Sequence, residues 1–175
     1  MQRLQAIDSL MEAHPQAAYD SLCHFDSLEV PNASRKVAMK CRMLMAKAQN
    51  KLYLQLSADT KFQEVVDYYD SWGTDNEKMQ AYYLLGCVYR DQKDAPKAMM
   101  SYKKAVECAD TLSKECDYST LSKVYGQINK SSRVTEALNI SEYSLLTNSE
   151  FPTYVRRNVL VGFFSSKACK RLFST

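Results

Sequence analysis

A glycine stands inside a segment of this chain that otherwise has the pattern of one continuous helix, residues 76–90. Gly86 lies near the end of that segment, in a chain with only four glycines in 175 residues. Glycine in a helix interior costs about 1 kcal/mol relative to alanine, so we expect a packing reason for it. Ala98 follows on a second helical segment, which begins at Pro96 and is expected to continue to about Leu112. Two small residues in consecutive helices predict that the two backbones approach closely.

The rest of the chain has the same organisation. Apolar residues recur at helical spacing, and each proline stands where one helical pattern ends and another begins. No segment alternates long enough to predict a strand, and Gly and Pro, at four each, are too few for a sandwich or barrel. We expect an all-α domain over residues 1–175, with helix hairpins at about 2–28, 33–72, 75–112 and 115–147 and a terminal helix at 152–173. Gly73 is expected to end a helix in the left-handed conformation.

The third hairpin carries aromatic, small and apolar residues at fixed offsets: Tyr82, Leu85, Gly86, Tyr89, Ala98, Tyr102 and Ala105. This spacing resembles the tetratricopeptide repeat, with Asp110 in place of the usual closing proline. The fourth hairpin fits more loosely, and its offset of 39 residues from Gly86 to Tyr125 is longer than the standard unit of about 34. The resemblance implies a right-handed α-α superhelix of about four hairpins plus a C-terminal helix.

In tetratricopeptide proteins the first helix of each hairpin lines a concave groove, so the resemblance also implies which side chains face a partner. This wall is polar and suits an extended peptide or a helix, and it departs from the lysine-and-asparagine pattern that clamps a terminal carboxylate in co-chaperones. Two alternatives stay open: the side chains are only solvated, or the chain's own last helix fills the groove. The implied groove residues are Arg42, Gln49, Asn50, Gln80, Tyr83, Cys87, Arg90, Asp91, Ser122, Lys123 and Asn129.

Three functions are compatible with these patterns. The first is a non-catalytic module that binds a protein or peptide in the groove. The second is the regulatory input of a larger signalling or transcription-regulating protein. It follows from the segments AIDSLMEAHPQAAYDSL and AYYLLGCVYRDQKD, which are similar to the N-terminal regions of bacterial tetratricopeptide proteins anchored at the cell envelope. The third is a scaffold that forms homo-oligomers through the last helix, with Val155, Val159, Phe163 and Leu172 as its apolar face.

Charge and hydropathy argue against a nucleic-acid partner and against a membrane span. The net charge is +3, and the aromatic residues are not interleaved with basic ones. Residues 151–175 carry five basic residues and no acid, which is most simply a solvated face, with an anionic partner or membrane surface as the alternative. The longest apolar run is far short of the roughly 20 residues that span a bilayer, and no signal peptide is visible. A cytoplasmic location is expected by default, with the cell envelope as the alternative.

No catalytic or cofactor-binding pattern is present in the sequence. The two histidines, His14 and His24, are not placed to pair with a nucleophile, and no glycine-rich phosphate loop or metal-binding motif occurs. The six cysteines have no CxxC spacing, and we expect most of them to be buried as small apolar residues. We therefore expect neither an enzyme nor a cofactor.

Overall fold

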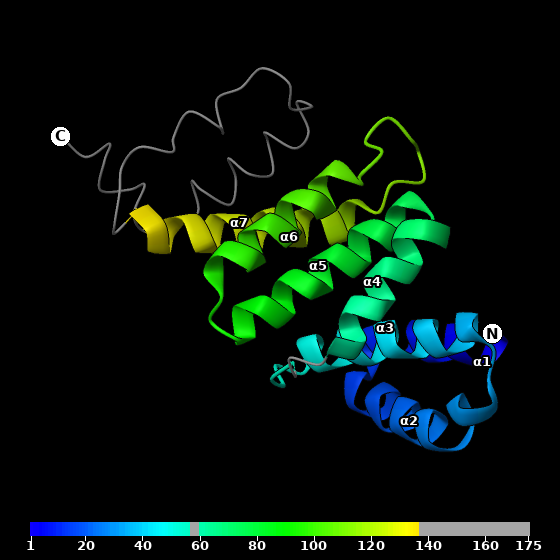
Figure 1. The fold of residues 1–175 in the computed structure, drawn as a ribbon. Helices are drawn as coiled ribbons and strands as arrows, with labels where there is room; N and C mark the ends of the chain where they lie inside the picture. Colours follow the sequence, from blue (N-terminus) through cyan, green and yellow to red (C-terminus); the bar gives the residue numbers. More distant parts are fainter. Residues whose placement is uncertain (57–59, 137–175) are drawn as a thin grey trace.

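The computed structural model describes residues 1–56 and 60–136, and this part of the chain is helical with no strand (Figure 1). The all-α expectation is therefore confirmed for the described residues. The C-terminal half of the expected fourth hairpin and the expected helix at 152–173 lie outside them. The helices are α1 (Gln2–Ala13), α2 (Pro15–Leu28), the short 3-10 helix η1 (Val30–Asn32), α3 (Arg35–Lys51), α4 (Thr60–Trp72), α5 (Asp75–Asp91), α6 (Ala95–Glu107) and α7 (Tyr118–Glu136).

The helices form a stack in which each one packs on the next helix along the chain. In addition, each odd-numbered helix contacts the next odd-numbered one, so that α1, α3, α5 and α7 form a continuous row. Figure 1 shows α1, α2 and α3 grouped at one end of the molecule, α5, α6 and α7 at the other, and α4 between them. The row of odd-numbered helices is the feature that positions the site described below.

Two apolar clusters hold the stack together, and α3 contributes to both. One face of α3 supplies Cys41, Leu44 and Ala48 to a cluster with α1 and α2. Another face supplies Met39 and Met43 to a larger cluster that extends through α4, α5, α6 and α7. Because α3 is buried on both sides, the first hairpin is joined to the rest of the molecule by a shared helix.

Helix α5 is the centre of the larger cluster. Residues 81–88 are all buried, and α5 contacts α3, α4, α6 and α7. The middle of α5 therefore lies inside the packed structure, while polar residues outside this stretch remain partly accessible to solvent. Burying a large apolar side chain contributes about 1.5–3 kcal/mol, so this helix carries much of the stabilisation of the stack.

The contact between α5 and α6 explains Gly86. A Cβ atom added at Gly86 would lie 2.3 Å from Cε1 of Tyr102 on α6, which is far inside van der Waals contact. Tyr102 is fully buried, and its hydroxyl lies 3.8 Å from Sγ of Cys87. Ala98 is also buried, as expected for a close pair of helices. Gly86 is thus required because the ring of Tyr102 on the next helix packs against it, and not because of a contact with Ala98.

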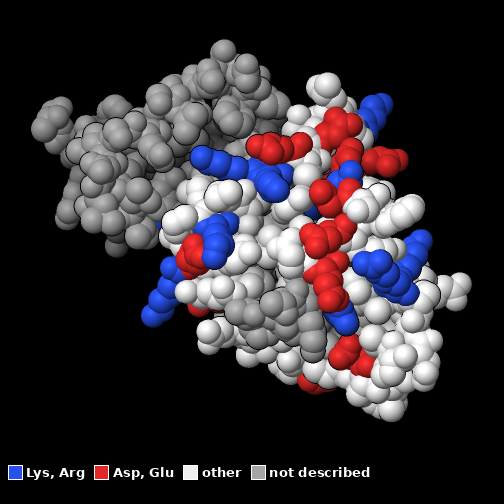
Figure 2. Space-filling model, viewed as in Figure 1, with Lys and Arg blue, Asp and Glu red and all other residues white. Residues whose placement is uncertain are grey.

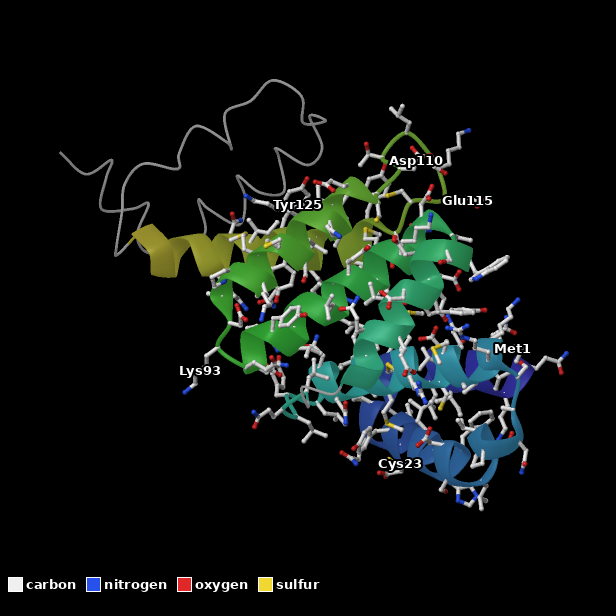
Figure 3. All side chains as sticks on the ribbon, in the orientation of Figure 1. Met1, Cys23, Lys93, Asp110, Glu115 and Tyr125 are labelled. Carbon is white, nitrogen blue, oxygen red and sulfur yellow. The ribbon has the colours of Figure 1, made fainter. Side chains whose placement is uncertain are left out.

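Two expectations about helix ends were wrong. Gly73 does not have a positive φ; its N–H donates to the Tyr69 carbonyl at 2.7 Å, and an added Cβ would lie 2.6 Å from that oxygen. Helix α6 ends at Glu107 and not near Leu112, since Asp110 starts a turn in which its Oδ1 accepts from the Leu112 N–H at 3.1 Å. Figure 3 shows Asp110 on the loop that leads to α7.

The left-handed helix ends fall on residues other than glycine. Tyr53 (φ 57°) follows α3, and Lys93 (φ 62°) follows α5 at its turn into α6 (Figure 3). In both places the next residue's N–H donates at 2.9 Å to a carbonyl in the last turn, Leu54 to Gln49 and Asp94 to Tyr89. A helix that ends with such a hydrogen bond has a left-handed residue just after its last turn, and that position normally favours glycine.

We expect Gly86→Ala to lower the free energy of unfolding by about 1–3 kcal/mol, because the new methyl group meets a buried ring that has no room to move. Gly126→Ala is the matched control: nothing lies within 4 Å of a Cβ at Gly126, which is inside α7. That change should raise stability by up to about 1 kcal/mol through helix propensity. Urea unfolding followed by circular dichroism measures both, and equal effects of the two substitutions would contradict this account of Gly86.

A second substitution tests the left-handed turn after α5. Lys93→Gly should raise the free energy of unfolding by about 0.5–1 kcal/mol, because it removes the steric cost of a Cβ at positive φ. Gln92→Gly, one residue earlier at φ −79°, has no such cost to remove and should be destabilising. The same unfolding experiment compares them, and a loss of stability in Lys93→Gly would show that the turn is not strained.

Candidate functional site

A hollow of about 780 Å³ runs along the row of odd-numbered helices, and we refer to it as the groove. Side chains from all four of these helices line it, together with the segment that follows α3. The lining residues are Glu12 of α1; Lys47, Asn50 and Lys51 of α3; Tyr53, Leu54 and Gln55; Gln80, Tyr83, Leu84, Arg90 and Asp91 of α5; and Thr120, Lys123, Gln127 and Lys130 of α7.

Helical spacing explains why each helix presents this set. On α7 the lining residues are separated by three, four and three positions, which places them in one row along the helix. On α3, Lys47, Asn50 and Lys51 have the same relation. The groove wall is therefore made of one face from each helix, while the opposite faces of the same helices are buried in the core.

Several residues implied by the sequence are brought together in the groove. Asn50, Gln80, Tyr83, Arg90, Asp91 and Lys123 all line it. Tyr83 is almost completely buried, and its hydroxyl accepts a hydrogen bond from Nδ2 of Asn50 at 3.3 Å, so it forms part of the floor. Tyr53 is the second aromatic residue on the described wall, and in contrast to Tyr83 it is 96% exposed.

Cys87, Ser122 and Asn129 do not line the groove. Cys87 is fully buried between α5 and α6 and lies in contact with the Tyr102 hydroxyl, so its expected exposure to a partner is wrong. Ser122 and Asn129 are each one position before a lysine that does line the groove.

Arg42 and Gln49 lie on a different face of α3 from the one that was expected. They line a smaller hollow of about 410 Å³ against α2, η1 and α4, and Arg42 forms an ion pair with Glu64 at 2.8 Å. The register of α3 was therefore misjudged. Lys47 and Lys51 take the groove positions instead; Lys47 is three residues before Asn50, and Lys51 is one residue after it. The helical pattern is compatible with this face but does not distinguish it from the expected one.

A polar network centred on Arg90 joins α3 to α5 at the groove floor. Nη2 of Arg90 donates to Oδ1 of Asn50 at 3.2 Å, and Nε donates to Oδ1 of Asp91 at 2.9 Å. The other oxygen of Asp91 accepts from the Leu56 N–H at 3.0 Å, which fixes the segment after α3. Nη1 of Arg90 lies 3.7 Å from Sγ of Cys87, so the planar guanidinium contacts three groups inside the molecule at once.

Burial and charge both affect the titration of groups along the groove. Burial raises the pKa of Tyr83 to about 12 and also raises the pKa of the Cys87 thiol, so both stay neutral at physiological pH. At the groove end formed by α1, the hydrogen bond from Lys51 lowers the pKa of Glu12, and the charges of Lys51, Lys123 and Lys47 act in the same direction. A carboxylate from α1 is therefore surrounded by lysines from α3 and α7.

Cations outnumber carboxylates on the groove wall. The cations are Lys47, Lys51, Arg90, Lys123 and Lys130, and the carboxylates are Glu12 and Asp91. Lys47 pairs with Asp8 at 2.6 Å and Lys51 with Glu12 at 2.7 Å. Lys123 and Lys130 are exposed, and neither has an ion pair among the described residues.

Acidic side chains gather on a different part of the surface. Figure 2 shows a column of them that passes over α4 and the helices next to it. Exposed members on and beside α4 are Glu64, Asp67, Asp70 and Asp75, and none of them lines the groove. The charges of this nearly neutral chain are therefore separated in space, with the basic excess inside the groove.

Comparison with protein-family models, with curated proteins and with solved structures finds no match to this chain. Within residues 1–56 and 60–136, no group of His, Cys, Asp and Glu side chains is arranged to hold a metal ion. None of the helices described is both long and apolar enough to cross a membrane. The groove is the feature on which a functional argument rests.

We expect Arg90→Ala to lower the free energy of unfolding by about 1–2 kcal/mol, because Asn50 and the partly buried Asp91 lose their charged donor. Lys123→Ala, a groove lysine without an ion pair among the described residues, should change stability by less than about 0.5 kcal/mol. Thermal and urea unfolding measure the difference between the two variants. If Arg90→Ala unfolds like the unsubstituted protein, the network contributes nothing to the packing of α3 on α5.

Proposed function

We propose that this chain is a non-catalytic protein-interaction module that binds an extended peptide or a helix in the groove. The observation that carries the proposal is the lining of one hollow by side chains from α3, α5 and α7, with Glu12 of α1 at its end. In stacked helix-hairpin proteins this row of first helices forms the binding surface. A volume of about 780 Å³ is also in the range of hollows that bind ligands.

We further propose that the stack is of the tetratricopeptide type. Support comes from the equivalence of α3 and α5: both have 17 residues, and the polar pair Asn50 and Arg90, separated by 40 positions, lies at the same place in each. Both helices also end in the same left-handed turn, at Tyr53 and Lys93. The following helices, α4 and α6, each have 13 residues. Such an internal correspondence is typical of repeats that stack on their neighbours.

The chemistry of the wall favours a polypeptide over a small molecule. The wall presents amides, hydroxyls and charges along its whole length, with Leu54, Leu84 and the ring of Tyr53 as its apolar part. Axes of packed helices are about 8–10 Å apart, so four helices in a row span about 25–30 Å. An extended chain of about eight or nine residues has this length.

Selection from a displayed library of random dodecapeptides tests the proposal. Peptides enriched on the unsubstituted protein should lose binding to Gln127→Trp, in which a large ring projects from a half-buried position on the groove wall. Gln63→Trp is the matched control, since Gln63 is exposed on α4 and does not line the groove. The proposal fails if no peptide is enriched, or if Gln63→Trp and Gln127→Trp affect binding equally.

A further inference from the structure

We propose that the groove selects acidic peptides: an extended segment of a partner protein in which several Glu or Asp side chains face the lysines of α7 and α3. This inference rests on the function proposed above and names the chemical class of its ligand. The charge of the groove wall carries it, because five cations and two carboxylates line the groove among the described residues. Complementary charge at a binding surface determines which partners associate and how fast.

Helix α7 supplies the two cations that are available to a ligand. Lys123 and Lys130 are exposed and have no ion pair among the described residues. They are seven positions apart, which is about two helical turns or 10 Å along one face. Two carboxylates of a ligand that lie about 10 Å apart can therefore each meet one of these lysines.

Helix α3 supplies two further lysines, which are held by carboxylates at the edge of the groove. The side chain of Glu12, the partner of Lys51, is 70% exposed. Ion pairs this exposed contribute only about 0–1 kcal/mol, so a carboxylate of the ligand can replace Glu12 at little cost. The pair of Lys47 and Asp8 is less exposed, with 24% and 30% of the two side chains accessible, so it is displaced less easily. Arg90, in contrast, is occupied by Asn50 and Asp91 and acts on the ligand through the shape of the floor.

The same charges disfavour two other occupants. The chain's own residues 151–175 contain five basic residues and no acid, so like charges would meet if they entered the groove. A nucleic acid would require basic residues interleaved with several aromatic rings, whereas Tyr53 is the only strongly exposed ring on the described wall. An acidic polypeptide needs neither of these features.

Fluorescence anisotropy with defined probes tests the inference on the full chain. The probe is a fluorescein-labelled dodecapeptide of alternating glutamate and alanine, compared with the same peptide carrying glutamine or lysine and with a labelled single-stranded oligonucleotide of equal length. At about 50 mM salt, where screening is weak, we expect the glutamate peptide to bind at least about tenfold more tightly than the glutamine peptide. The lysine peptide should not bind.

Matched charge reversals locate the site. The double variant Lys123→Glu/Lys130→Glu should weaken binding of the glutamate peptide by at least about tenfold. Lys103→Glu/Lys114→Glu changes the net charge equally at exposed positions outside the groove and should leave the affinity within about twofold. Circular dichroism confirms that both variants are folded before their affinities are compared.

Three results would overturn the inference. These are equal binding of the glutamate and glutamine peptides, equal effects of the two double variants, and tighter binding of the oligonucleotide than of the glutamate peptide. The library selection separates this failure from failure of the proposed function. If the enriched peptides are not acidic but still lose binding to Gln127→Trp, the groove binds peptides and only its charge selectivity is refuted.

Discussion

The aromatic ring of Tyr102 rests directly on the backbone of Gly86, and the rest of the structure depends on this contact. It fixes how α6 lies on α5, the helix whose middle is buried and which touches α3, α4 and α7 as well. A displacement of α5 would therefore be transmitted to every helix of the larger cluster. Since packed interiors have few voids, the missing side chain at one position sets the spacing of the whole stack.

The core and the groove are two sides of the same helices. Helix α5 buries residues 81–88 in the cluster and still presents Gln80, Arg90 and Asp91 to the groove at its two ends. Arg90 and Asn50 connect α5 to α3 through hydrogen bonds at the floor. As a result the groove wall has a fixed shape before any ligand arrives, which reduces the conformational entropy lost on binding.

Local patterns in the sequence were sufficient to predict the helices, but they were not sufficient to predict which face of each helix lines the groove. The spacing from Tyr82 to Ala105 predicted a close helix pair, and Gly86 was correctly assigned to packing. The faces of α3 and α7 were less well determined: Gln49 and Ser122 were expected in the groove and do not line it, whereas Lys51, which was not expected there, does. Amphipathic patterns do not distinguish two buried sides, and α3 is buried on both of them.

By itself, the sequence determined that the described part of this chain is helical and that its third hairpin packs closely. These properties depend on residues a few positions apart, through backbone hydrogen bonds, proline and the size of a side chain. Only the tertiary structure decided that Tyr102 covers Gly86, that Cys87 is buried, and that lysines from α3 and α7 surround Glu12. The physical reason is distance along the chain: the charge of the groove is a sum over residues from position 12 to position 130, which meet only when the helices are stacked.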